Sequence, residues 1–387
     1  MNNNPITLCN INSCTQCYSC VQVCPKACIS MRESLSGFKI PVIDDTSCIK
    51  CGACVSVCHR LNTAVHYHMP IKCYAGWITD SFDRAHSSSG GVFTALAKKV
   101  ISASGVVFGA SMSSDLKVSH IPIETLEDIT LLRGSKYLQS DLSGVYLKVK
   151  SCLNAGKKVL FTGTPCQISG LYSYLKGNPR GLITCDLVCH GVPSQASFDV
   201  WLSKIKINNA TQVNFRFTKG WGFQLSYKSK KASGESKIIL PYKGYYLKAF
   251  NKGLMFSEAC YTCSYAQVNR VADITLGDFW GIGQSIPFNY PVDRGISMVL
   301  ANTEKGLTFL ESTPQLSLID RPLDEAVAGN QNLQHPSTRP RGRDTYFLDS
   351  KSLNLFTLCK KYRLWPSLRD YLRVAKQILL SAVKFRT

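Results

Sequence analysis

The sequence contains no run of about 18 or more consecutive apolar residues, the length that a membrane-spanning helix needs. The opening stretch from Met1 to Ile11 is polar and lacks the apolar segment of a secretory signal. No motif typical of a nucleic-acid-binding protein is present. These absences predict a cytoplasmic protein that neither crosses a membrane nor binds nucleic acid.

Acidic residues are scarce in this chain. There are 25 Asp and Glu residues against 45 Lys and Arg residues, which gives a formal net charge of +20. A surplus of this size attracts anionic partners such as acidic proteins or anionic lipid, although it also serves simple solubility. The 387 residues, 45% of them hydrophobic, suffice for two or three globular domains.

Cysteine, by contrast, is abundant, with 18 residues. In a chain of this length, cluster-type spacing indicates a reducing compartment and not a disulfide framework. Two runs carry this spacing: Cys14-x-x-Cys17-x-x-Cys20-x-x-x-Cys24-Pro25 and Cys48-x-x-Cys51-x-x-Cys54-x-x-x-Cys58-His59. The pattern is typical of bacterial ferredoxins with two [4Fe-4S] clusters, in which the fourth cysteine of each run serves the other cluster. The predicted ligands are Cys14, Cys17, Cys20 and Cys58 for the first cluster, and Cys48, Cys51, Cys54 and Cys24 for the second.

A zinc site fits the two runs less well than iron–sulfur clusters do. Zinc knuckles would need ligands in pairs, which a repeated triple-cysteine run does not supply. His59 replaces the proline expected after the second run, and we expect little effect because that proline fixes a turn and is not a ligand. Cys9 and Cys28 lie outside the ligand pattern, and we interpret Cys28 as a packed core cysteine.

The rest of the chain alternates between strand and helix patterns. We predict strands over 38–43, 64–68, 74–79, 105–110, 157–161, 182–188 and 296–301, a β-rich stretch over 212–242, and helices over 92–101, 124–131, 142–153, 168–175, 195–207, 245–253 and 304–311. Strand, tight turn and helix in this order are typical of a parallel α/β sheet, which binds ligands at the carboxyl ends of its strands. The Ser- and Gly-rich loop over 84–91 suits a nucleotide phosphate, or is an ordinary serine cap with packing glycines.

Four short motifs then appear in sequence: Gly163-Thr-Pro-Cys-Gln167, Cys189-His-Gly, Cys260-x-x-Cys263 and Ala272-Asp-Ile-x-x-Gly-Asp-x-Trp280. With these motifs the stretch from about Cys73 to about Arg343 resembles the beta-subunit family of coenzyme F-420 hydrogenase and dehydrogenase. The resemblance implies an FAD-binding iron–sulfur oxidoreductase that moves electrons between clusters and a flavin, and from there to an organic acceptor.

The resemblance also implies site residues. Cys166, Cys189, Cys260 and Cys263 match cysteines that would ligate a further [4Fe-4S] cluster, with a zinc site or redox-idle core cysteines as alternatives. The flavin would lie against Ser89, Gly90, Gly91, Lys136, Tyr137, Thr162, Gly163, Thr164, Pro165, Gln167 and Asp278. The candidate catalytic residues are Lys136, which would stabilise an anionic reduced flavin or is a solvated surface lysine, and His190, which would deliver a proton or is structural.

The expected fold class is α+β or α/β, in three parts. Residues 1–70 form the dicluster ferredoxin domain, 71–343 a mixed α/β flavin-binding domain, and 344–387 a basic helical tail. A helix expected from Trp365 to Phe385 would lie on anionic lipid as a peripheral membrane contact, or pack on its own domain or a partner. Acidic ferredoxins or flavodoxins, or hydrogenase-type subunits, are the expected partners.

The expected function is transfer of electrons from a ferredoxin-like donor through the clusters to FAD and an organic acceptor. The acceptor would be coenzyme F-420 or, by family association, a substrate of a polysaccharide pathway. The alternative is an electron-relay subunit of a larger complex with no substrate of its own.

Overall fold

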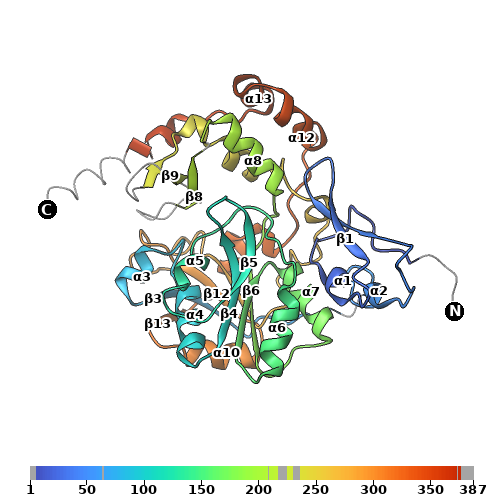
Figure 1. Cartoon of the computed structure of the whole chain (residues 1–387). Helices are drawn as coiled ribbons and strands as arrows, with labels where there is room; N and C mark the ends of the chain where they lie inside the picture. Colours follow the sequence, from blue (N-terminus) through green and yellow to red (C-terminus); the bar gives the residue numbers. More distant parts are fainter. Residues whose placement is uncertain are drawn as a thin grey trace.

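The computed structural model describes residues 6–62, 65–207, 209–216, 225–229, 236–372 and 374–375. The described chain has three parts, a small module with the two cysteine runs, a central α/β sheet and an upper lobe of helices and short strands (Figure 1). None of the described helices combines the length and the apolar character needed to cross a membrane.

The small module is a two-fold repeat of a cysteine loop followed by a short helix. Helices α1 (Ser19–Val23) and α2 (Ala53–Ser56) begin within the two runs, and strands β1 (Ile29–Glu33) and β2 (Lys39–Ile43) form an antiparallel hairpin between them. The two loops have the same backbone, since Gln16 and Lys50 both have φ of 56°, and Tyr18 and Gly52 are also left-handed before their helices. The repeated sequence therefore folds as a structural repeat.

The central sheet has eight strands in the order β13-β3-β12-β11-β7-β6-β4-β5. Strands β4, β6, β7 and β11 run parallel, while the pairs β4–β5, β11–β12, β12–β3 and β3–β13 are antiparallel. The strands are β3 (Lys72–Ile78), β4 (Val106–Met112), β5 (Val118–Ile123), β6 (Val159–Gly163), β7 (Leu182–Leu187), β11 (Ile274–Asp278), β12 (Ser297–Ala301) and β13 (Leu316–Asp320). The sheet is thus mixed, with a parallel centre.

Helices cover both faces of this sheet, because alternate strand residues point to opposite faces. Val107 and Leu160 face α4 (Val92–Ser102) and α10 (Glu304–Glu311), whereas Phe108 and Phe161 face α6 (Val145–Asn154) and α7 (Pro165–Leu175). The remaining helices around the sheet are α3 (Ser81–Ala85), α5 (Ile129–Leu132), α11 (Leu323–Gly329) and the turn η3 (Gln331–Leu333). Strands buried on both sides account for their nearly continuous apolar sequences.

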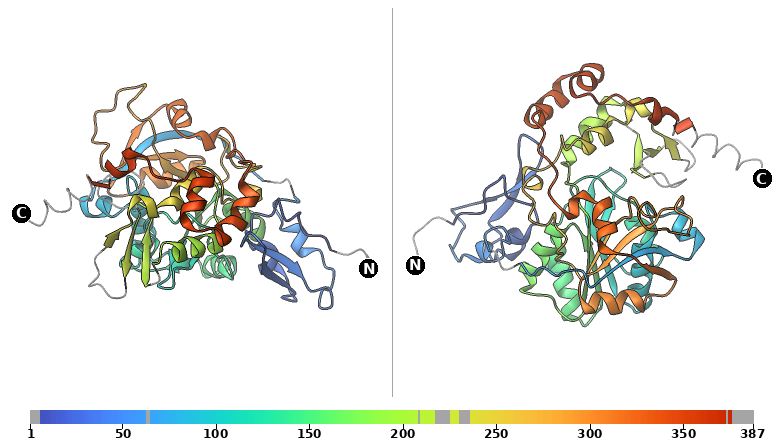
Figure 2. Two further views of the ribbon diagram at one scale, coloured as in Figure 1. Left: turned by 90° about the horizontal axis from the view of Figure 1, so that it is seen from above. Right: turned by 180° about the vertical axis from the view of Figure 1, so that it is seen from behind.

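The upper lobe has its own hydrophobic core, built around Trp201, Tyr246 and Tyr346. Its elements are α8 (Gln195–Lys204), β8 (Ala210–Asn214), β9 (Ser226–Ser229), β10 (Ser236–Ile238), η1 (Pro241–Lys243), α9 (Tyr245–Asn251), η2 (Glu258–Cys260), α12 (Arg343–Ser352) and α13 (Leu355–Tyr362). The C-terminal helices α12 and α13 pack into the core that α8 and α9 form (Figure 2). The C-terminal helical segment is therefore present and part of a larger folded unit.

Most predicted elements are present, and the differences are local. The strand expected over 64–68 is wrong from Val65 onward, where only His68 forms an isolated bridge, and Ala64 lies outside the described residues. Helix α7 begins at Pro165, earlier than expected, and α5 is only the end of the helix expected over 124–131. Strands β1, β5, β11 and β13 were not expected. Part of the β-rich stretch, and the predicted tail helix at 373 and beyond 375, lie outside the described residues.

Candidate functional site

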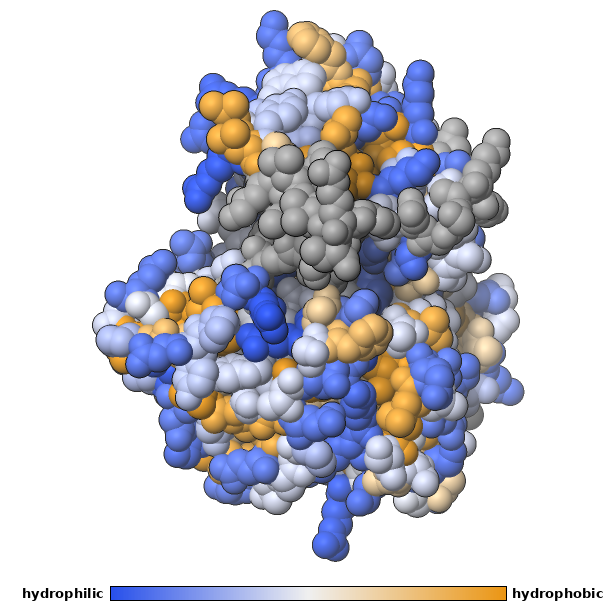
Figure 3. All heavy atoms as spheres, turned by 90° about the vertical axis from the view of Figure 1, so that its left-hand side faces the viewer, coloured by the Kyte–Doolittle hydropathy of each residue, from blue (hydrophilic) through white to orange (hydrophobic). Residues whose placement is uncertain are grey.

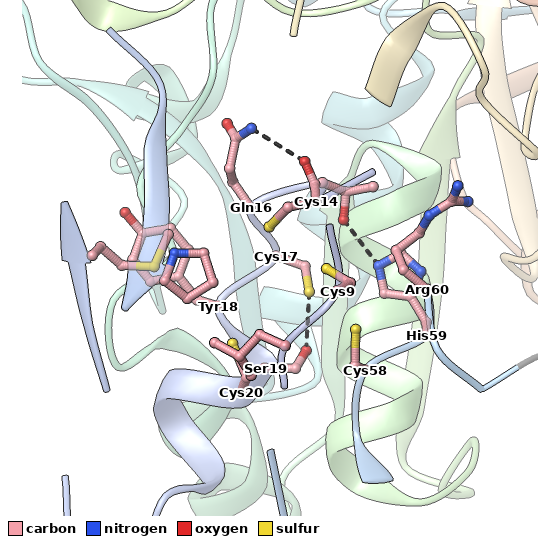
Figure 4. Close-up of a pocket in the computed structure, with 14 residues that line it drawn as sticks. Cys9, Cys14, Gln16, Cys17, Tyr18, Ser19, Cys20, Cys58, His59 and Arg60 are labelled. Atoms are coloured by element: carbon pink, nitrogen blue, oxygen red, sulfur yellow. Dashed lines mark hydrogen bonds between the residues drawn. The ribbon is translucent and has the colours of Figure 1, made fainter. Parts of the chain in front are cut away.

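The first cluster site is a small cavity in the N-terminal module (Figure 4). Three of its thiols come from the first cysteine loop, and Cys58 reaches it from the end of the second run. The cysteines that line it are Cys9, Cys14, Cys17, Cys20 and Cys58. Cys58 of the second run thus joins the three cysteines of the first run, as expected. Cys9 is a fifth cysteine at this site and was not expected.

The second cluster site is the matching cavity on the other side of the module. Cys24 from the first run joins three thiols of the second run there, and the cysteines that line it are Cys24, Cys28, Cys48, Cys51 and Cys54. Cys28 is buried, as expected, but its Sγ lies 3.4 Å from Cys24 Sγ on the cavity wall. Cys28 is therefore a packed core cysteine, as expected, and it also contributes its thiol to the cavity wall.

A third group of cysteines assembles where the central sheet meets the upper lobe. Cys166 lies in the first turn of α7, Cys189 follows β7, Cys260 ends η2 and Cys263 lies in the next turn. Burial raises the pKa of the Cys166 thiol well above its usual value, and the three other thiols are close enough to raise it further. The third cluster site thus collects the four cysteines of the sequence motifs.

The thiols of the first and second sites surround cavities and do not converge on one point. In the described part of the chain, no group of three or more His, Cys, Asp or Glu side chains is arranged to hold a single metal ion. A cluster of four irons spreads its four thiolate ligands around itself, one on each iron. Soft sulfur donors arranged around a cavity therefore fit an iron–sulfur cluster better than a lone zinc ion.

The buried guanidinium of Arg270 supports the third cluster site. It donates to the carbonyl oxygens of Tyr265 at 2.9 Å and Leu187 at 3.1 Å, which ties the loop after Cys263 to the end of β7. Burial, followed by the neighbouring Cys263 thiol, raises the pKa of Cys189 to about 12, and Arg270 opposes that rise. Arg270 therefore holds the backbone around the thiols and stabilises negative charge there.

The first and third cluster sites adjoin each other. A Cβ atom on Gly170 of α7 would lie 2.7 Å from Cys17 Cβ and 3.0 Å from Cys17 Sγ, so only glycine permits this approach. Ser19 Oγ donates to the Gly170 carbonyl oxygen at 2.8 Å. Since Cys166 lies one helical turn before Gly170, α7 links the two sites.

His59 forms a second link between these sites. It is 5% exposed; its Nε2 lies 2.9 Å from Thr15 Oγ1 and its Nδ1 lies 2.6 Å from Tyr265 Oη. Thr15 follows the first ligand of the first cluster site, and Tyr265 follows Cys263. We expected little effect from a histidine here, but the structure gives it a joining role that proline cannot have.

A cavity of about 440 Å³ lies above the carboxyl ends of the parallel strands. Thr162 and Gly163 at the end of β6 and Asp278 at the end of β11 line it from the sheet, and Phe250 lines it from α9 of the upper lobe. Its volume lies within the range of about 300–1,000 Å³ that is usual for cofactor and ligand sites. This position is where an open α/β sheet is expected to bind ligands.

Most of the predicted flavin residues line this cavity. They are Ser89, Gly91, Lys136, Tyr137, Thr162, Gly163, Thr164, Gln167 and Asp278, together with His190 and Cys189. Gly90 and Pro165 do not line it. A Cβ atom on Gly90 would lie 2.2 Å from the Gly76 carbonyl oxygen, so this glycine permits close packing, and Pro165 opens α7.

Lys136 is at the cavity wall, but its ammonium is directed elsewhere. Its Nζ donates to the carbonyl oxygens of Leu131, Leu132 and Arg133 at 3.3, 2.9 and 2.8 Å, which caps the end of α5. Burial lowers its pKa to about 7. The interpretation of Lys136 as a solvated lysine is wrong, and the role of its charge toward a flavin stays a prediction.

A buried ion pair lies beside the cavity. Arg216 Nη1 donates to Asp278 Oδ2 at 2.7 Å and to Tyr137 Oη at 3.2 Å. His190 lines the cavity, and its ring packs edge-on against Phe250 at 6.4 Å. Burial lowers the pKa of His190, so a neutral imidazole is favoured.

A polar network below the cavity was not expected from the sequence. His120 Nε2 lies 2.8 Å from the Thr162 carbonyl oxygen and its Nδ1 lies 2.8 Å from Ser140 Oγ, which also accepts from Gln167 Nε2 at 3.0 Å. Burial lowers the pKa of His120 to about 4. His120 belongs to β5, and only the recognition of that strand could have indicated its position.

Residues 13–60 match the family model described as a 4Fe-4S dicluster domain, so the chain is an iron–sulfur protein. Residues 156–320 match the model for the C terminus of the beta subunit of coenzyme F420 hydrogenase/dehydrogenase. Residues 156–320 thus carry the C-terminal domain of this oxidoreductase family, as the motifs indicated.

One solved structure shows a distant likeness. It is the xenon derivative of the F420-reducing [NiFe] hydrogenase complex from Methanosarcina barkeri, with 20% sequence identity and a TM-score of 0.47 over 75% of this chain and 91% of that chain. No curated protein matches the chain.

Proposed function

We propose that the protein is an FAD-dependent iron–sulfur oxidoreductase that takes electrons from an acidic carrier and delivers them to an organic acceptor. One observation carries this proposal: the cysteine sites and the large cavity adjoin one another in a series. Cys17 of the first cluster site contacts α7 at Gly170, and Cys189 belongs both to the third cluster site and to the cavity wall. The second cluster site shares the module with the first.

The second cluster site is the proposed entry point. Cys51 is exposed, and Lys26 and Ile49 on the cavity rim are exposed as well. A positive rim on a basic protein steers an acidic ferredoxin or flavodoxin toward this cluster. The first cluster site is more enclosed, because Cys14 is buried and Cys17 faces α7 at Gly170.

The cavity is the proposed flavin site. Ser89 and Gly91 lie at the start of helix α4, and Thr164 lies at the start of helix α7. Backbone N–H groups at helix starts suit a pyrophosphate. A flavin bound there would supply the chemistry that joins single-electron clusters to a two-electron acceptor. Asp278 and Arg216 would orient the ring end, and His190 would exchange a proton with the acceptor.

Cofactor analysis of the anaerobically purified protein tests this proposal. We expect about 12 iron atoms per chain for three [4Fe-4S] clusters, one FAD, and flavin bleaching when electrons enter through the clusters. A protein that holds iron but neither contains nor binds FAD would overturn the flavin assignment. The variant Cys189→Ala should lose about four irons, whereas Cys152→Ala, which removes a cysteine outside the three sites, should lose none.

The alternative function is an electron-relay subunit without its own substrate. The match to a beta-subunit family favours it, because such subunits work with hydrogenase or dehydrogenase partners. Co-purification with a stoichiometric partner, and no turnover of coenzyme F-420 or of sugar-nucleotide substrates by the isolated chain, would support the relay. Turnover by the isolated chain with a reduced ferredoxin would support the enzyme.

A further inference from the structure

Each cluster site of the N-terminal module is lined by five cysteines, although a [4Fe-4S] cluster takes four. The additional thiols are Cys9 at the first site and Cys28 at the second. Figure 4 shows the Cys9 side chain directed into the first cavity, between Cys17 and Cys58. Neither residue belongs to the two ligand runs.

The two additional thiols occupy the same place relative to their sites. Cys9 shares the first cavity with Cys14 and Cys58, the predicted first ligand and crossing ligand of that site, and its thiol interacts most strongly with these two. Cys28 Sγ lies 3.4 Å from Cys24 Sγ, the predicted crossing ligand of the second site, and shares that cavity with Cys48, the predicted first ligand, with which its thiol also interacts. Both sites therefore keep a spare thiol beside the same two ligand positions.

The repeat of the ligand runs does not explain this coincidence. When the two runs are superposed, Cys14 corresponds to Cys48 and Cys24 to Cys58. The residue that corresponds to Cys9 is then Ile43, and the residue that corresponds to Cys28 is Asn62. The chain thus brings a fifth thiol to equivalent places from two non-equivalent positions, one before a run and one after it.

We propose that Cys9 and Cys28 are standby ligands, each able to replace the first or the crossing cysteine of its cluster. This inference rests on the clusters of the proposed function. In the exchange, the standby thiol would release a proton and bind the iron that the departing cysteine gives up, and the departing cysteine would take up a proton. No electron is transferred, and the iron–sulfur core keeps its composition.

The geometry limits the exchange to these two ligand positions. The 3.4 Å between Cys28 Sγ and Cys24 Sγ places the standby thiol beside the position that Cys24 would leave. The Cys17 thiol instead pairs with a hydroxyl, Ser19 Oγ, at 3.3 Å. Because the Cys9 thiol interacts most strongly with Cys14 and Cys58, we predict that loss of either leaves the cluster in place, whereas loss of Cys17 costs it.

Alanine variants of the full chain test the proposal through iron content and the resonance spectrum of the reduced clusters. Cys14→Ala and Cys24→Ala should retain the wild-type iron content. The double variants Cys14→Ala/Cys9→Ala and Cys24→Ala/Cys28→Ala should each lose about four irons, as should the controls Cys17→Ala and Cys51→Ala. Circular dichroism confirms that each variant is folded before iron is counted.

The outcomes separate this inference from the proposed function. If Cys14→Ala and Cys24→Ala lose as much iron as Cys17→Ala, or if the double variants keep their iron, the standby role is refuted while the clusters stand. If the wild-type chain itself takes up no iron, the proposed function fails first. The single variants Cys9→Ala and Cys28→Ala should keep all their iron, and loss of a cluster in either would make that thiol an obligatory ligand instead.

Discussion

At the scale of single residues, Gly170 matters because of what it lacks. Its missing side chain lets α7 contact the loop of the first cluster site, with 2.7 Å left between a hypothetical Cβ and Cys17 Cβ. The third cluster site begins one turn away at Cys166. The contact between α7 and the loop of Cys17 thus depends on one hydrogen atom in place of a methyl group.

The variant Gly170→Ala should therefore separate the two sites. Overpacking of a rigid contact lowers the free energy of unfolding by about 1–3 kcal/mol. We also expect slower electron transfer from the dicluster module to the cavity and an altered resonance spectrum of the first cluster. Gly181→Ala is the control, since its Cβ would meet its nearest neighbour at 3.4 Å. Equal behaviour of the two variants would contradict the role of this contact.

Asp83 is a second residue with a large expected effect. Its carboxylate is 3% exposed and is paired with both Lys98 and Arg133. Arg133 lines the cavity, so the pair also fixes one wall of the proposed flavin site. Asp83→Asn leaves two cations with reduced compensation, and we expect a loss of about 3–5 kcal/mol in unfolding free energy. Denaturant titration measures it, with the exposed Glu127→Gln as a control that should change little.

At the scale of elements, α7 connects three features. Its N-terminus borders the cavity at Thr164, its first turn carries Cys166 and its second turn contacts Cys17 through Gly170. Gln167 fixes this start, because its Oε1 accepts from the Thr164 amide at 2.9 Å and its Nε2 donates to Ser140 Oγ at 3.0 Å. The helix is thus held in place at the end where the sites meet.

Replacement of Gln167 by Met keeps the volume but removes both hydrogen bonds. The Thr164 amide and the Ser140 hydroxyl each lose a partner near a buried position. The free energy of unfolding of the variant should therefore be about 1–3 kcal/mol lower than that of the wild type. It should also bind FAD more weakly, as measured by flavin fluorescence titration. The exposed Gln331→Met should alter neither quantity. Unchanged FAD affinity in Gln167→Met would show that the start of α7 does not shape the flavin site.

At the scale of the whole molecule, charge is expected to govern the choice of redox partner. Lys26 is exposed at the second cluster site, the proposed entry point. Lys26→Glu should slow reduction by an acidic ferredoxin about tenfold at low salt, with the difference fading as salt rises. Stopped-flow reduction measures the rate. Arg180→Glu makes the same change of charge on the loop before β7 and should have little effect on the rate of reduction. If both variants slowed reduction equally, net charge alone would explain the rate.

The C-terminal region combines exposed apolar and basic residues. Phe356, Trp365, Leu368 and Leu372 are 64%, 40%, 76% and 62% exposed, and the rings of Phe356 and Trp365 are 5.4 Å apart. Figure 3 shows apolar surface among hydrophilic residues over the upper lobe. With Lys360 and Arg369 nearby in the chain, this surface has the composition of a peripheral contact with anionic lipid.

Vesicle binding tests this contact. The wild-type chain should sediment with vesicles that contain anionic lipid and not with neutral ones, and Leu368→Asp should weaken that binding because a carboxylate resists burial among headgroups. Leu35→Asp is matched in chemistry, since Leu35 is 89% exposed on the hairpin of the N-terminal module, and it should bind as the wild type does. Equal binding of the wild type and Leu368→Asp would refute the lipid contact.

The local chemistry of this protein could be predicted from the order of its residues. Thiolate spacing in the two runs defines which loops can wrap a cluster. Apolar strands followed by tight turns and helices define a sheet and the edge at which it binds ligands. Both patterns depend on residues that are close together in the chain. The contacts between distant residues became known only from the folded chain: Cys9 shares a cavity with Cys58, His59 joins Tyr265, and Gly170 contacts Cys17. Such contacts arise from the packing of whole elements, and spacing along the chain carries no record of them.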